Sequence, residues 1–126
     1  MGYNLNNDVP LGQLGSAYLA DDSAFTPPTG RVIIAITMVD ETSFSILAPE
    51  LPTDSTFKGS STGGNSDINC IGTVAPVDSN GTNADAVGGS DVFPKGLTIY
   101  GRWKTVQLNN DVGAPTTCVV ILYFGI

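Results

Sequence analysis

The stretch that decides the fold lies at the end of the chain, where residues 97–124 read LTIYGRWKTVQLNNDVGAPTTCVVILYF. The odd-numbered residues from Leu97 to Trp103 form one row, and polar or amphipathic residues stand between them. This period-two alternation predicts a β-strand. The apolar row changes phase at Thr105 and continues at Val106 and Leu108. A strand changes face only where a residue is inserted, so the sequence predicts a β-bulge between Gly101 and Val106.

The run from Thr117 to Phe124 is apolar on both of its faces, which is typical of a strand covered on both sides. In a domain of this size one cover is the hydrophobic core. The other is either the N-terminal segment or a second subunit.

Two earlier runs also predict strands. Residues 31–39 place Val32, Ile34, Ile36 and Met38 on one face, and residues 43–48 then place Phe44, Ile46 and Ala48 on one face. A short polar turn, residues 40–43, separates the two runs, which predicts a β-hairpin.

The rest of the chain predicts an arm and a loop around a single domain. Residues 1–30 are expected to form an extended arm, either against their own domain or along a neighbouring subunit, and residues 31–126 form one β domain. Residues 53–92 are rich in Gly, Ser, Asn and Asp and predict a long loop, of a length that is usually functional. The expected fold is therefore all-β, a small antiparallel β-sandwich or barrel with an extended N-terminal arm and a long loop.

The composition of the chain limits the classes of partner that it can bind. The 126 residues carry 12 acidic and 5 basic side chains, a net charge of −7, although charged residues make up 13% of the chain. An acidic chain without a basic cluster is repelled by nucleic-acid phosphates and by anionic lipids. Neither nucleic acid nor membrane is therefore expected as a partner.

Side chains that could run ordinary catalysis are scarce. The chain has no histidine, which removes the common nucleophile–base pairs and the commonest metal ligand. Residues 78–85 concentrate oxygen ligands around a glycine but do not fit the calcium-loop pattern. Cys70 and Cys118 are expected to be free thiols. We expect no enzyme activity, no catalytic residues, no cofactor and no metal.

Contact with a partner is the remaining role for the conspicuous side chains. Trp103 is expected in the core, since it shares a face with Ile99. The opposite face of that strand and the apolar residues of the arm and of the final strand are the predicted interface. Its residues are Tyr3, Leu5, Leu11, Leu14, Tyr18, Tyr100, Arg102, Val120, Leu122 and Phe124.

The same C-terminal region carries a resemblance. Residues 93–103 (FPKGLTIYGRW), then 106–108 (VQL) and the ending 119–125 (VVILYFG), resemble the C-terminal end of small structural proteins of tailed bacteriophages, particularly marine ones. The match covers about a quarter of the chain, and its motif is a generic strand pair. Residues 1–90 show no such resemblance.

The resemblance implies a non-enzymatic virion protein, a β-barrel or β-sandwich that decorates the outside of the capsid. It would be made in the host cytoplasm and located at the capsid surface. Its partners would be the major capsid protein and copies of itself, with a trimer at a local threefold axis as one arrangement. Two alternatives stay open. One is a carbohydrate- or receptor-binding module of the fibre-tip type that uses residues 53–92, and the other is a tail or neck component.

Overall fold

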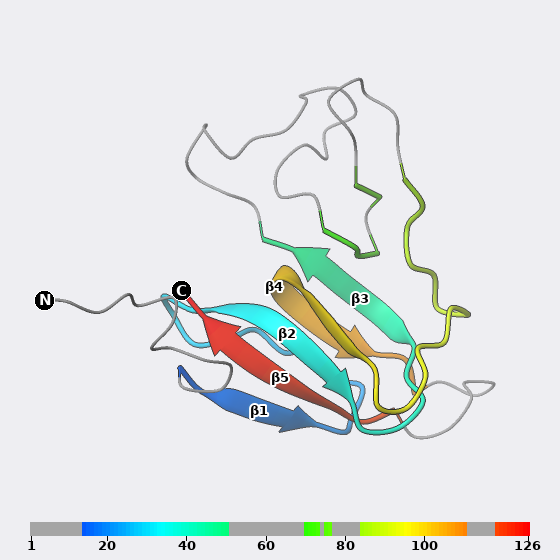
Figure 1. Cartoon of the computed structure of the whole chain (residues 1–126), viewed down its shortest axis with the longest axis horizontal. Helices are drawn as coiled ribbons and strands as arrows, with labels where there is room; N and C mark the ends of the chain where they lie inside the picture. Colours follow the sequence, from blue (N-terminus) through cyan, green and yellow to red (C-terminus); the bar gives the residue numbers. More distant parts are fainter. Residues whose placement is uncertain (1–13, 51–69, 74, 77–83, 111–117) are drawn as a thin grey trace, which may run out of the picture.

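The computed structural model describes residues 14–50, 70–73, 75–76, 84–110 and 118–126 (Figure 1). This part of the chain contains five strands and no helix. The strands are β1 (Ser16–Leu19), β2 (Val32–Met38), β3 (Phe44–Pro49), β4 (Thr98–Leu108) and β5 (Val120–Gly125). They form one antiparallel sheet in the order β1-β5-β2-β4-β3. The expectation of an all-β fold is confirmed, as a single open sheet.

The predicted hairpin of the second and third strands is wrong. β4 lies between β2 and β3 and hydrogen-bonds to both, and β2 and β3 do not pair. Residues distant in sequence bond to the connection between them. Thr42 and Phe93 exchange backbone hydrogen bonds of 3.0 and 2.7 Å, and Val39 N donates to Val119 O at 2.9 Å. Long-range partners therefore replace the local pairing that a short polar turn suggests.

The predicted bulge is confirmed. Thr105 pairs with Ala48 and Trp103 pairs with Pro49, so the register of β4 against β3 shifts between these two positions. Trp103 and Val106 consequently both point into the core, and both are fully buried. β4 can therefore bury its first and second halves on the same side of the sheet.

Two further register shifts were not visible in the sequence. One lies between Ile33 and Ala35 of β2, and the other between Phe44 and Ile46 of β3. As a result Ile33 is fully buried together with Ile36, and Leu47 is fully buried together with Phe44. The sequence placed Ile34 on one face with Ile36, and Ile46 and Ala48 on one face with Phe44. These three residues are only half-buried, so the predicted faces are wrong beyond each register shift.

The core gathers on one face of the sheet. Trp103 and Phe44 are its largest fully buried side chains, and Phe93 meets the Phe44 ring edge to face at a centroid distance of 5.5 Å. The remaining buried core residues are Leu19, Ile33, Ile36, Met38, Leu47, Ile99, Val106, Leu108, Cys118, Val120, Leu122 and Phe124.

The described part of the predicted arm belongs to the domain. Residues 16–19 are β1, and Phe25 makes an antiparallel bridge to Val106 with backbone hydrogen bonds of 2.8 and 3.0 Å. The Phe25 ring also stacks on Phe124 of β5 at 5.8 Å, so residues 20–25 cross the core side from β1 to β4. Residues 1–13 lie outside the described part.

A short segment of the predicted loop is also built into the fold. Thr73 N donates to Leu47 O at 2.8 Å, and Thr73 Oγ1 accepts from Leu47 N at 3.1 Å. Ile71 O accepts the indole N–H of Trp103 at 2.7 Å. Residues 70–73 therefore fasten onto β3 and onto the centre of the core. Residues 51–69, 74 and 77–83 of this region lie outside the described part.

Two neighbouring buried hydroxyl groups give a stability prediction. Ser43 Oγ has no hydrogen-bond partner among the described residues although Ser43 is fully buried, whereas Thr42 Oγ1 donates to Asp40 O at 2.9 Å. We expect Ser43→Ala to raise the free energy of unfolding by about 1 kcal/mol, because an unsatisfied buried hydroxyl is removed. Thr42→Val, which deletes a bonded hydroxyl at equal volume, should lower it by about 1 kcal/mol. Urea denaturation measures both; a loss of stability in Ser43→Ala would contradict the first expectation.

Candidate functional site

The face of the sheet opposite the core carries two rows of side chains that run across four strands. In the first row Tyr18, Ile121, Thr37 and Thr98 are paired neighbours on β1, β5, β2 and β4. In the second row Ser16, Tyr123, Ala35 and Tyr100 are paired in the same strand order. We call these residues the tyrosine face. None of them is charged, although the whole chain has a net charge of −7.

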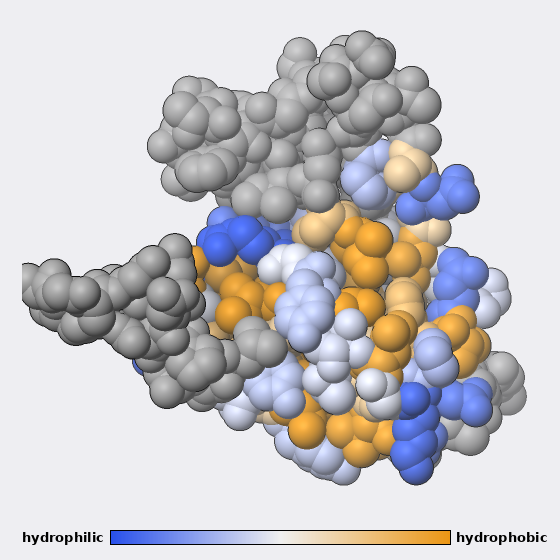
Figure 2. Space-filling model, viewed as in Figure 1, coloured by the Kyte–Doolittle hydropathy of each residue, from blue (hydrophilic) through white to orange (hydrophobic). Residues whose placement is uncertain are grey.

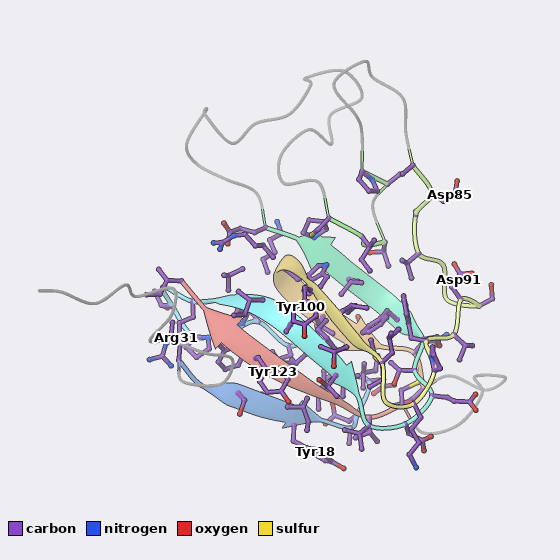
Figure 3. The ribbon with its side chains drawn as sticks, in the orientation of Figure 1. Tyr18, Arg31, Asp85, Asp91, Tyr100 and Tyr123 are labelled. Carbon is purple, nitrogen blue, oxygen red and sulfur yellow. The ribbon has the colours of Figure 1, made fainter. Side chains whose placement is uncertain are left out.

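The tyrosines give this face its chemistry. Tyr18 and Tyr100 are 68% and 65% exposed, and Tyr123 is half-buried between them in the strand order. Figure 3 shows the three rings spread over the sheet, on β1, β5 and β4. Because neighbouring strands lie about 4.8 Å apart, Tyr100 and Tyr123 stand about 10 Å apart on either side of Ala35.

The tyrosine face is less hydrophilic than the surface at its margins. In Figure 2 the surface over these strands is pale or orange, and the strongest blue lies towards its margins. The Thr37 and Thr98 hydroxyls bond to each other at 2.9 Å at the β4 end of the first row. Such a face presents aromatic rings and uncharged hydroxyls, and it can bind a partner by apolar and hydrogen-bonding contact without displacing a buried charge.

The structure places the predicted interface residues in three groups. Tyr18 and Tyr100 share the tyrosine face, and Leu14 lies half-buried just before β1. Val120, Leu122 and Phe124 are core residues, at 0%, 0% and 5% exposure in the single chain. The outward residues of β5 are Ile121 and Tyr123 instead. Tyr3, Leu5 and Leu11 lie outside the described residues.

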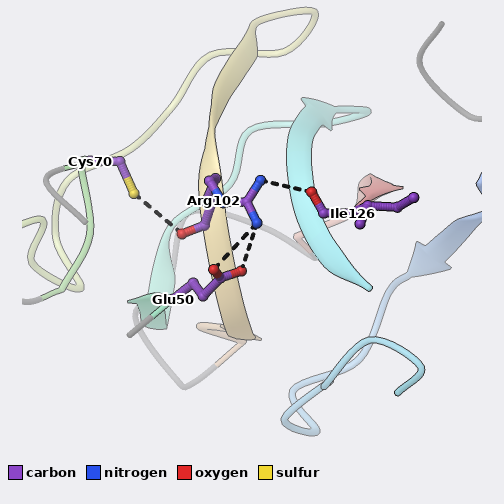
Figure 4. A network of polar contacts seen from close by, with 4 residues as sticks. All are labelled: Glu50, Cys70, Arg102 and Ile126. Carbon is purple, nitrogen blue, oxygen red and sulfur yellow. Dashed lines mark hydrogen bonds and ion pairs between the residues drawn. The ribbon is translucent and has the colours of Figure 1, made fainter. Parts of the chain in front are cut away.

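The Arg102 side chain bonds to two groups of its own chain. Its guanidinium forms an ion pair with Glu50 at 3.1 Å, and its Nη1 donates to Ile126 O at 3.0 Å (Figure 4). The two side chains of the pair are 36% and 28% exposed, so this pair contributes little to stability. Arg102 therefore neutralises Glu50 at the edge of the tyrosine face and connects β4 to the end of the chain.

Cys70 joins the same network from the other side. Its thiol donates to Arg102 O at 3.4 Å (Figure 4). Burial raises the pKa of the Cys70 thiol, while the backbone and the positive charge of Arg102 act in the opposite direction. Cys70 and Cys118 are both free thiols, as the sequence predicted. A thiol with a raised pKa is a poor nucleophile at neutral pH.

Other kinds of site find no support in the described residues. No three His, Cys, Asp or Glu side chains in the part of the chain that the structure describes are grouped so that they could hold a metal ion. The suggested oxygen-rich loop, residues 78–85, falls mostly outside that part. A helix long and apolar enough to cross a membrane is likewise not found among the described residues.

Of the eight residues of the tyrosine face, the sequence analysis named Tyr18 and Tyr100 as interface residues. Thr98 and Tyr100 follow from the alternation of β4, since they stand opposite the buried Ile99. Tyr123 and Ile121 were missed because a strand that is apolar on both faces does not show which face is covered. Their pairing with Tyr18 and Thr37 depends on strand order, for which the sequence carries no local signal.

Comparison with known proteins found no match that bears on the function. No protein-family model, curated protein or solved structure matches this chain. The tyrosine face and the strand edges beside it are therefore the features from which a function has to be argued.

Proposed function

We propose that this chain is a non-enzymatic structural protein that attaches to a larger protein assembly through its tyrosine face, and that it is a capsid decoration protein of a tailed bacteriophage. The observation that carries the proposal is the uncovered, uncharged sheet face with Tyr18 and Tyr100 about two-thirds exposed. Tyrosine is enriched in protein interfaces, and charged residues are depleted at their centres. The C-terminal resemblance supplies the identity of the assembly.

Charge supports a protein partner in particular. The tyrosine face has no lysine or arginine with which to bind phosphates, and the chain as a whole is acidic. The major capsid protein is the proposed partner, together with further copies of this chain at the virion surface after synthesis in the host cytoplasm. The sandwich or barrel expected from the sequence belongs to this proposal, since a partner seated on the tyrosine face supplies the second layer of a sandwich. The predicted arm and loop would add contacts around it.

Cosedimentation with purified capsids tests the attachment. We expect the wild-type protein to bind saturably and the Tyr18→Ser/Tyr100→Ser double variant to bind about tenfold to a hundredfold more weakly, because two exposed interface rings are lost. Lys95→Ser, a change of an exposed turn residue that is not part of this face, is the control and should bind normally. A truncation of residues 1–13, which leaves β1 intact, measures the contribution of the arm.

Either of two results would count against the attachment proposal. One is the failure of folded wild-type protein to bind capsids, with binding to isolated tails pointing to a tail or neck component. The other is unchanged binding by the double tyrosine variant, which would move the contact elsewhere.

A second function is favoured by the same rings. Exposed aromatic side chains stack on the apolar faces of sugars, and the threonine hydroxyls of the tyrosine face can bond to sugar hydroxyls. The alternative function is therefore a carbohydrate-binding module. Its sugar-binding surface would be the tyrosine face, whereas the sequence analysis placed that surface in residues 53–92. Retention on a neutral polysaccharide, lost in the double tyrosine variant and without any capsid binding, would establish it.

A further inference from the structure

The outer edge of β1 is open. In the described part of the chain, β1 pairs with β5 on one side and with no strand on the other. Phe124 N donates to Gly15 O at 2.9 Å, so Gly15 and Phe124 form a hydrogen-bonded pair of the antiparallel ladder. Because such pairs alternate along a ladder, Ala17 and Leu19 also bond towards β5. The backbone N–H and C=O groups of Ser16 and Tyr18 therefore point away from the sheet.

These outward groups have no partner among the described residues of this chain. Ser16 and Tyr18 make no backbone hydrogen bond beyond β5 among the residues that the structure describes. The opposite edge of the sheet is different, because Thr73 takes both the N–H and the C=O of Leu47 on β3. Within the described part of the chain, one edge of the sheet is thus covered by residues 70–73, and the edge of β1 is available to pair with a strand.

We propose that the open edge of β1 pairs with β1 of a second copy of this chain, antiparallel and about a twofold axis perpendicular to the sheet. In this arrangement Ser16 lies opposite Tyr18 of the second copy, and each opposed pair exchanges both of its N–H···O bonds. The arrangement is self-complementary, because the outward groups belong to Ser16 and Tyr18 and the twofold axis passes beside Ala17. It closes after two copies.

Charge at the two ends of β1 selects the antiparallel direction. Asp21 and Asp22 follow the C-terminal end of β1 and are exposed. At the N-terminal end Arg31 is exposed, and its Nη1 would lie 3.3 Å from a Cβ at Gly15. Arg31 has no ion pair among the described residues. Antiparallel pairing brings the aspartates of each copy towards Arg31 of the other, whereas parallel pairing would bring the aspartates of both copies together.

The dimer has a functional consequence for the tyrosine face. A twofold axis perpendicular to the sheet keeps the same face of both copies on the same side. The two tyrosine faces then join through Tyr18 into one continuous uncharged surface of twice the width. This inference does not rest on capsid attachment, and it is tested without capsids.

Sedimentation equilibrium of the full chain measures the association. We expect a monomer–dimer equilibrium with a dissociation constant on the order of 100 µM, since the paired strands are short. Tyr18→Pro removes the outward N–H and no bond to β5, and proline is tolerated on a strand edge of this kind. It should weaken the dimer at least about tenfold. Tyr18→Thr, which also loses the ring but keeps the N–H, is the matched control and should still dimerise.

A charge exchange gives an independent test if Tyr18→Pro fails to fold. Arg31→Asp should weaken the dimer by about threefold to tenfold, and adding Asp21→Arg and Asp22→Arg to it should restore the association. Added salt should weaken the wild-type dimer, because these charges are exposed. Three outcomes would overturn the proposal: a chain that stays monomeric up to about 1 mM, at ten times the expected constant, a trimer, or a dimer that neither Tyr18→Pro nor the Arg31 exchange affects.

Discussion

Replacing Trp103 with alanine should lower the free energy of unfolding by about 3–5 kcal/mol, which is a large part of the stability of a domain of this size. Trp103 is 0% exposed and pairs with Ile33 on one side and with Pro49 on the other. Alanine would leave a large cavity in the core and would also leave Ile71 O without the indole N–H that bonds to it at 2.7 Å. Chemical denaturation followed by circular dichroism measures the loss.

Trp103→Phe separates the two contributions. Phenylalanine fills most of the cavity but donates no hydrogen bond, so we expect it to cost about 1–3 kcal/mol, less than alanine does. The Trp103 variants should also loosen residues 70–73, which proteolysis can report. The loss expected for a buried tryptophan is about 3–5 kcal/mol. If Trp103→Ala lowers the free energy of unfolding by less than about 1 kcal/mol, Trp103 is not a core residue.

Gly72→Ala should cost about 2–4 kcal/mol, a large effect for the addition of one methyl group. A Cβ at Gly72 would lie 2.4 Å from Leu47 O and 3.0 Å from Pro49 Cδ. Leu47 O belongs to the backbone of β3 and cannot move without breaking its bond from Thr73 N. We therefore expect residues 70–73 to detach from β3, which also removes the Trp103–Ile71 bond.

Gly88→Ala is the control for the effect of the substitution itself. Its Cβ would meet the flexible carboxylate of Asp91 at 3.4 Å, an ordinary contact, so stability should stay within about 0.5 kcal/mol of the wild type. Thermal denaturation of both alanine variants gives the comparison. Equal stability of Gly72→Ala and Gly88→Ala would show that residues 70–73 are not held tightly against β3.

Several features of the fold were predictable because their causes are local. The alternation from Leu97 to Trp103 reflects which side chains face the core, and the phase change before Val106 shows where the extra residue sits. The role of Trp103 in the core follows from the same row. The period-two alternation of the separate runs similarly predicts the all-β class of the described chain.

The errors share a different cause. Residues 31–39 and 43–48 are close in sequence with a polar turn between them, yet β4 lies between the strands they form. The sequence around the turn does not report that β4 is long enough to pair with both strands, or that Phe93 and Val119 hold the connection. The register shifts in β2 and β3 are equally non-local, because each depends on the partner strand.

Assignment of the predicted interface shows the same division. Tyr100 was placed on the outward face of its strand by alternation, and the structure has it there at 65% exposure. Val120 and Leu122 were expected to contact a partner and are in the core, because a run of apolar residues does not state which of its faces is covered. The partner of Arg102, Glu50, lies 52 residues away in the sequence.

By itself the sequence determined the class of the fold, the bulged strand β4 and the side chains that face the core along that strand, because side-chain burial imposes a period that can be read along one strand. It also determined the absence of histidine and the acidic balance of the chain. Only the tertiary structure decided the strand order, which brings Tyr18, Tyr123 and Tyr100 onto one uncharged face and leaves the edge of β1 open. The reason is that strand order and register depend on hydrogen bonds and packing between residues far apart in the chain, and no short stretch of sequence contains both partners.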